Sequence, residues 1–166
     1  TEELLLFQKL IKHCGSDSVD FRGWLSDKTF DHNVFGMPNL GMKISEISDL
    51  DSVFLIGSRL RDEFPLLAQK FRVATKQNGL RVAQLNAIEQ SLLMPVEQSI
   101  LLKPTHWEFL LQEILNICNQ KYSGVEFNSN PVFYDLALKI TKMFFQDDPN
   151  IKKTLILAGP SVFSHP

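Results

Sequence analysis

The apolar positions of this chain follow two patterns: short runs, and longer stretches in which apolar residues recur every three or four positions. Short apolar runs bounded by turn residues are typical of strands buried on both faces of a parallel sheet. Three such strands are predicted, at residues 53–56, 80–85 and 154–158. The helical spacing predicts four longer helices, near residues 2–14, 65–77, 107–120 and 131–145. Because strands that alternate with helices form βαβ units, we expect an α/β fold, with a Rossmann-like parallel sheet and helices on both faces.

Residues that start and stop helices support these boundaries. Gly15 and Asn78-Gly79 end two of the helices, and Asn130-Pro131 opens another. Shorter elements are predicted between them: a strand at 19–21, a short helix or turn at 44–50, and one extended piece within the loop 86–104.

The stretch from Asp51 to Arg72 has the pattern of a buried strand, a glycine turn and a helix. Gly57 ends the strand, and Pro65 suits the first helical position because its missing N–H would be unpaired there anyway. A strand that leads through glycine into a helix N-terminus favours negative charge, since free N–H groups and the positive end of the helix dipole point the same way. This geometry predicts a crevice for a phosphate or a nucleotide.

Two arginines, Arg59 and Arg61, lie in that turn and could hold a phosphate beyond the end of the strand. The alternative is that they pair with nearby acids such as Asp62 and Glu63, or with another part of a longer parent chain. The turn lacks the G-x-G-x-x-G pattern, so a site of the NAD type is not predicted.

The composition is that of a globular protein. The chain has 166 residues, 44% apolar and 22% charged, enough for one domain with a core. Its net charge of -2 gives no reason to expect nucleic acid or an anionic membrane as a partner. No apolar run approaches the ~20 residues that span a bilayer. Cys14 and Cys118 lie on apolar helical faces and are predicted to be buried thiols in a reducing compartment.

No catalytic or metal site is predicted within the chain. The four histidines are scattered without ligand spacing, and neither cysteine belongs to a C-x-x-C unit; these histidines are His13, His32, His106 and His165. The first residues already have a helical pattern, and the last residues follow a strand and its glycine turn. We therefore expect residues 1–166 to be one α/β piece of a longer polypeptide, with apolar surface where its borders were covered.

Several stretches resemble a known family in the same order along the chain. The run GSDSVDFR at 15–22 resembles the segment G-S/T-x-N-V/I-D-H-R of the molybdopterin oxidoreductase-like region in the large iron–sulfur subunit (75 kDa type) of respiratory complex I. Residues 36–86 are similar to the family's V-L-L-I-G-S/T-N-x-R-x-E-x-P-L-L block and the strand after it. The terminal TLILAGPSVFSHP is similar to a later strand with a glycine turn and H-P.

Within the loop, Gly57 and Ser58 match the family pattern, and Arg61 and Glu63 match its complex I variant. Arg59 departs from the pattern, which has asparagine there. In the molybdenum enzymes this loop holds a guanine dinucleotide, so the resemblance implies a vestigial dinucleotide loop formed by Gly57, Ser58, Arg59 and Arg61, without bound cofactor.

The resemblance implies a scaffold role in NADH:quinone oxidoreductase. The parent subunit would carry 4Fe-4S and 2Fe-2S iron–sulfur clusters elsewhere and pass electrons from NADH toward quinone, while this piece holds no cluster. Its partners would be other peripheral-arm subunits, on the cytoplasmic side of the bacterial inner membrane or the mitochondrial matrix side, without direct membrane insertion. Two alternatives stay open: part of the dinucleotide pocket in a true molybdopterin enzyme, such as a formate dehydrogenase or nitrate reductase, and a free-standing nucleotide-binding module.

Overall fold

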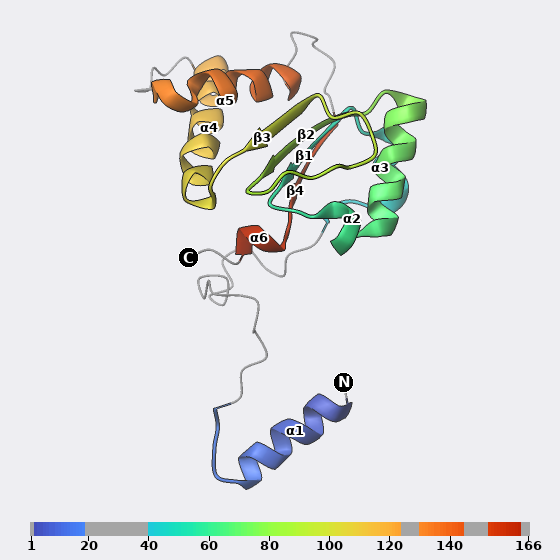
Figure 1. The fold of residues 1–166 in the computed structure, drawn as a ribbon, viewed down its shortest axis with the longest axis vertical. Helices are drawn as coiled ribbons and strands as arrows, with labels where there is room; N and C mark the ends of the chain where they lie inside the picture. Colours follow the sequence, from blue (N-terminus) through green and yellow to red (C-terminus); the bar gives the residue numbers. More distant parts are fainter. Residues whose placement is uncertain (1, 19–39, 124–129, 145–152, 164–166) are drawn as a thin grey trace.

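Four parallel strands form one sheet in the order β3-β2-β1-β4 (Figure 1). The structure is a computed structural model, and it describes residues 2–18, 40–123, 130–144 and 153–163. The strands are β1 (Ser52–Ile56), β2 (Arg81–Asn86), β3 (Gln98–Leu101) and β4 (Thr154–Ala158). Strand β1 pairs with β2 on one side and with β4 on the other, so the predicted parallel sheet is confirmed.

The direction of strand addition reverses at β1. From β1 the chain moves outward to β2 and β3, and it then returns to place β4 on the other side of β1. In open α/β sheets such a reversal is a topological switch point, and ligands bind outside the carboxyl ends of the two strands that flank it. The switch point of this sheet therefore lies beyond Ile56 and Ala158.

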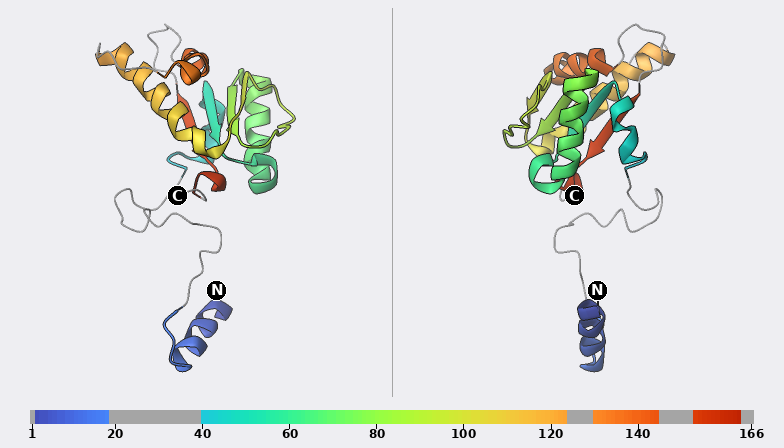
Figure 2. Two further views of the ribbon diagram at one scale, coloured as in Figure 1. Left: turned by 60° about the vertical axis from the view of Figure 1, so that its left-hand side comes forward. Right: turned by 90° about the vertical axis from the view of Figure 1, so that its right-hand side faces the viewer.

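Helices cover both faces of the sheet (Figure 2). One face carries η2 (Ile44–Asp49), α2 (Leu60–Glu63) and α3 (Pro65–Asn78), and the other carries α4 (Trp107–Ser123) and α5 (Pro131–Phe144). The short 3₁₀ helix η3 (Pro104–His106) leads directly into α4. The short helix α6 (Pro160–Phe163) follows β4. The helix α1 (Glu2–His13) is the first element.

Alternate residues of β1 divide the core into two clusters. Phe54 and Ile56 pack toward α4 and α5, whereas Val53 and Leu55 pack toward η2 and α3. Because successive side chains of a strand point to opposite faces, an all-apolar strand needs cover on both sides. The Phe54 ring lies 5.7 Å from the ring of Phe144 on α5, which joins the strand to that helix.

Local sequence explains where α3 begins and ends and where α5 begins. Pro65 is the first residue of α3, and Gly79 ends it in the left-handed conformation at φ 71°, with its N–H donating to the Ala74 carbonyl. Before α5, the Asn130 side-chain oxygen accepts a hydrogen bond from the Val132 N–H at 3.1 Å, as expected of a residue that caps a helix N-terminus. These three boundaries were predicted from the same residues, and the predictions are confirmed.

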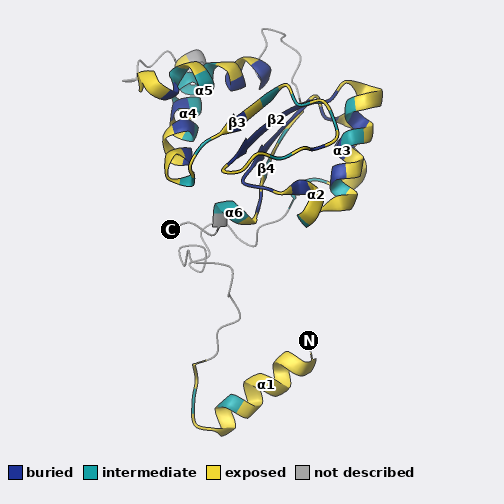
Figure 3. Cartoon of the chain, in the orientation of Figure 1, coloured by how far each residue is buried: buried dark blue, intermediate teal, exposed yellow. Residues whose placement is uncertain are grey.

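Two predictions about burial are wrong. Strand β4 was predicted to be buried, but it is an edge strand, and its Thr154, Ile156 and Ala158 are exposed. Only β1 flanks it, so one edge of its backbone has no neighbouring strand among the described residues. Cys14 was predicted to be buried and is exposed, because no residue of α1 is buried (Figure 3). Cys118 is half-buried, and neither cysteine forms a disulfide.

The remaining elements agree with the predicted pattern, apart from three short helices that were not predicted: α2, η3 and α6. The extended piece within 86–104 is the strand β3, and the short helix at 44–50 is the 3₁₀ helix η2. The proposed strand at 19–21 lies outside the described residues.

Candidate functional site

The loop after β1 lies at the switch point of the sheet. Gly57 adopts φ 59°, a left-handed conformation that glycine enters without strain, and it turns the chain out of the strand. The short helix α2 follows directly, so the strand does not lead straight into α3 as expected from the sequence. Arg61 accordingly lies within α2 rather than in the turn.

The carboxylate of Glu63 folds back onto this loop. The Ser58 hydroxyl donates to Glu63 Oε2 at 2.9 Å, and the backbone N–H of Arg59 donates to the same oxygen at 2.8 Å. The Arg59 Nε lies 3.9 Å from Glu63 Oε1, with side chains that are 60% and 15% exposed. The donors that a bound anion would use are thus taken by an anionic side chain of the protein. For Arg59, pairing with a nearby acid is confirmed.

The structure separates the two arginines. Arg61 Nη1 donates to the backbone carbonyl of Ser91 at 3.1 Å, in the loop between β2 and β3. Arg59 stays with Glu63, so the two guanidinium groups have different partners. Anion binding by the Gly57–Arg61 loop stays a prediction.

The exit of β4 packs directly against the same loop. The Gly159 N–H donates to the Ile56 carbonyl at 2.8 Å, and the Ser161 N–H donates to the Gly57 carbonyl at 3.2 Å. A Cβ atom on Gly159 would lie 2.4 Å from the Ser58 Cα. The two loops at the switch point are therefore in backbone contact, in the place where open α/β sheets usually hold a ligand.

Helix α4 closes this region from the other face. A Cβ atom on Gly57 would lie 2.8 Å from the Trp107 ring. Trp107 is itself fixed, since its indole N–H donates to the Leu102 carbonyl at 3.0 Å. Two glycines thus permit the close packing of the β1 loop against β4 and α4.

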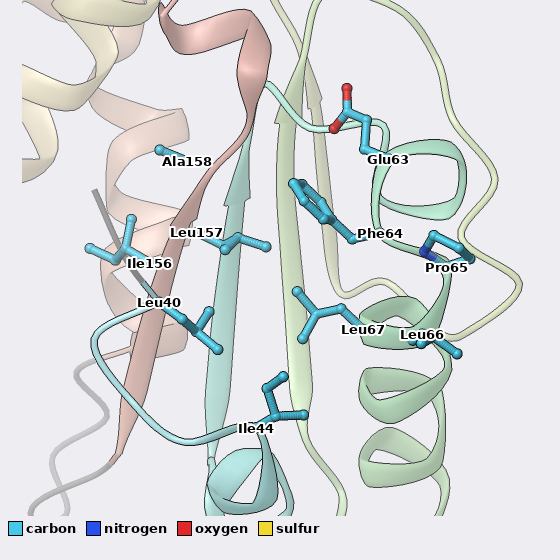
Figure 4. Close-up of a pocket in the computed structure, with 10 residues that line it drawn as sticks. All are labelled: Leu40, Ile44, Glu63, Phe64, Pro65, Leu66, Leu67, Ile156, Leu157 and Ala158. Atoms are coloured by element: carbon cyan, nitrogen blue, oxygen red, sulfur yellow. The ribbon is translucent and has the colours of Figure 1, made fainter. Parts of the chain in front are cut away.

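An open apolar groove runs beside the edge strand β4 (Figure 4). Its volume is about 720 Å³, and Glu63 is the charged residue in its lining, at one end of the groove. Its walls are formed mainly by apolar side chains, among them Leu40, Ile44, Phe64, Leu66, Leu67 and Ile156. This groove was not predicted from the sequence. Two residues could have indicated the groove. Ile44 and Leu66 are apolar but lie outside the core-facing positions of their helices.

Other candidate residues have structural roles. His106 packs near the ring of Phe133, with 5.8 Å between ring centroids. The buried Glu113, which the sequence analysis missed, accepts a hydrogen bond from the Asn130 N–H at 3.1 Å and so joins α4 to the start of α5. His32 and His165 lie outside the described residues. Across the residues that the structure describes, no group of three His, Cys, Asp or Glu could hold a metal ion.

None of the helices in the described part of the chain is long and apolar enough to cross a membrane.

Replacing Glu63 with alanine is expected to destabilise the loop by about 1–3 kcal/mol, because the buried Ser58 hydroxyl and the Arg59 N–H lose their acceptor. In a double-mutant cycle with Ser58→Ala, measured by urea unfolding, the combined loss should be smaller than the sum of the single losses by about 0.5 kcal/mol or more. Asp62→Ala, at an exposed neighbour, serves as the control and should change stability by less than about 0.5 kcal/mol. Strictly additive losses would show that the two side chains do not interact.

Sequence comparison identifies the family. The sequence model of the family Molybdopterin oxidoreductase matches residues 1–97, which include β1, the loop with Glu63, α3 and β2. Comparison with curated proteins finds no match. The family match spans more than half of the 166 residues and agrees with the parallel α/β fold and its switch-point loop. The chain therefore belongs to the molybdopterin oxidoreductase family.

Proposed function

We propose that this chain is a non-catalytic scaffold domain of the large iron–sulfur subunit, the 75 kDa type, of respiratory complex I, the NADH:quinone oxidoreductase. Residues 1–166 would form one α/β piece of the C-terminal region of that subunit. The parent subunit passes electrons from NADH toward quinone through 4Fe-4S and 2Fe-2S clusters outside this piece. The chain would contact other subunits of the peripheral arm, without inserting into the membrane.

The observation that carries this proposal is the position of the Glu63 carboxylate. A guanine dinucleotide, the group that the family implies for this loop, brings phosphates with negative charge. The Ser58 hydroxyl and the Arg59 N–H, which could receive a phosphate, donate instead to Glu63. A phosphate beside that carboxylate would meet like charge without gaining these donors. The residues of the loop therefore do not fit the dinucleotide.

The packing of the loop supports the same conclusion. Gly159 lies against Ser58, and the Trp107 ring lies against Gly57, so protein atoms occupy the space directly beside these two residues of the loop. The Arg59 side chain adds bulk where the family pattern has the smaller asparagine. We therefore assign no redox step to this loop.

The identity of the residues favours complex I over other members of the family. Arg61 and Glu63 match the complex I variant of the loop, and Glu63 is the residue that takes the loop's donors. Molybdenum enzymes often have histidine just before the proline, where this chain has Phe64. The groove beside β4 offers the kind of apolar surface through which a scaffold contacts its neighbours.

The rival function is part of the dinucleotide pocket in a molybdopterin enzyme such as a formate dehydrogenase or nitrate reductase. The two can be separated by capturing the native assembly that contains this chain under non-denaturing conditions. We expect the captured assembly to oxidise NADH with a quinone acceptor, and to contain iron but no molybdenum by elemental analysis. An assembly that contains molybdenum and oxidises formate or reduces nitrate would contradict the proposal and support the rival.

A further inference from the structure

A second pocket lies between α2, α3 and the loop that joins β2 to β3. In Figure 1 this loop runs beside α3. The pocket has a volume of about 260 Å³, and Arg61 from α2 and Arg72 and Gln69 from α3 supply its polar lining. Ala68, Leu92 and Leu93 are among its apolar lining residues. Two arginines from different helices thus line one small space.

Neither arginine of this pocket is neutralised by a neighbouring acid. Within the described ranges, no carboxylate lies within ion-pair distance of Arg61 or Arg72. Helix α3 itself carries Lys70, Arg72 and Lys76 and no acidic residue, although the whole chain has a net charge of -2. Among the described residues, the pocket is therefore a local region of positive charge without a paired carboxylate.

The loop side of the pocket is held in place. Arg61 Nη1 donates to the Ser91 carbonyl, and the adjacent Leu92 is 4% exposed in the core cluster beneath α3. A guanidinium group has five N–H donors, so this single bond leaves most of the Arg61 fork available. Arg72 and Gln69 lie three positions apart on α3, a spacing that places them side by side on the helix surface.

We propose that this pocket binds a phosphate group, either free phosphate or the terminal phosphate of a small phosphomonoester. Two guanidinium forks match the two negative charges and the several acceptor oxygens of a phosphate. The Gln69 amide supplies a further donor. The volume suits one phosphate and is below the range of pockets that enclose larger ligands. The site uses Arg61 and Arg72 and does not use Arg59, whose partner is Glu63.

Titration of the whole chain with inorganic phosphate at low ionic strength, followed by calorimetry, tests this assignment. We expect a dissociation constant on the order of 1 mM, as for a small exposed anion site. Arg72→Gln should weaken binding by about tenfold or more, because it removes one charged fork. Arg72→Lys keeps the charge but not the fork, so its affinity should lie between those of the original chain and Arg72→Gln.

Two matched variants serve as controls. Lys70→Gln removes one positive charge from α3 outside the pocket, and Arg59→Gln removes one from the Gly57–Glu63 loop. Both should leave phosphate affinity within about twofold of the original value, since long-range charge effects are weak at exposed sites. Circular dichroism of each variant shows whether it remains folded before its titration is interpreted.

Glycerol 3-phosphate, titrated in parallel, separates the two sources of phosphate. Equal or tighter binding of the ester assigns the pocket to phosphomonoesters, and tighter binding of inorganic phosphate assigns it to the free anion. The proposal is overturned if Arg59→Gln weakens binding while folded Arg72→Gln does not, because the anion would then lie at the switch-point loop. It is also overturned if all three charge-removing variants weaken binding equally, or if phosphate does not bind.

Discussion

Replacing Phe54 with alanine is expected to lower the free energy of unfolding by about 3–5 kcal/mol. Phe54 is 2% exposed at the centre of β1, the strand that pairs on both sides and contributes to both core clusters. Its ring packs against Phe144 with a centroid distance of 5.7 Å, so truncation removes apolar contacts on the face that α5 covers. The cavity lies between a strand and a helix that are both held by other contacts, and it cannot collapse easily.

Equilibrium unfolding in urea measures this loss as a shift in the transition midpoint at an unchanged slope. Phe7→Ala makes the same chemical change on α1, where the ring is 54% exposed, and should cost less than about 0.5 kcal/mol. Similar losses for the two variants would contradict the division of the chain into a packed sheet and an α1 that buries nothing against the described residues.

The central strands could be predicted from the sequence because their own residues indicate that they are buried on both faces. The run Val53–Ile56 is apolar at every position, and such a run is stable only when both faces are covered. The run at Thr154–Ala158 is similarly apolar but belongs to an edge strand. Its exposure follows from the order of strands in the sheet, which depends on long-range pairing with β1. The residues of the strand alone therefore do not indicate that it lies at an edge.

The candidate site shows the same division between local and long-range information. Gly57 and the pairing of Arg59 with Glu63 were accessible from the sequence, since these residues lie within one turn of chain. The contact of Gly159 with Ser58 joins residues about 100 positions apart and arises only when β4 pairs with β1. The pocket of Arg61 and Arg72 likewise depends on the angle between α2 and α3, because an unpredicted short helix carries Arg61 away from the turn.

Replacing Gly159 with alanine is expected to destabilise the sheet by about 3 kcal/mol or more, at the upper end of the cost of overpacking. The added Cβ would lie 2.4 Å from both Cα and Cβ of Ser58 and 2.5 Å from the Gly57 carbonyl oxygen. Two of these three atoms belong to the backbone, so a change of side-chain rotamer cannot relieve the clash. Either β4 must move away from β1 or the β1 loop must shift. Either movement weakens the bond from the Gly159 N–H to the Ile56 carbonyl at the switch point.

Gly79→Ala provides the control for this variant, since Gly79 ends α3 at φ 71° and has open space around the position of a Cβ. Alanine there should cost only the strain of a left-handed conformation, about 1–2 kcal/mol. Urea unfolding of both variants compares a clash with conformational strain alone. Hydrogen exchange should also show faster exchange of the amides at positions 159 and 161 in Gly159→Ala, because their acceptors, the Ile56 and Gly57 carbonyls, lie where the displacement occurs. A loss for Gly159→Ala no larger than that for Gly79→Ala would mean that the β1 and β4 loops are not in contact, and the space for a dinucleotide at the switch point would then be open.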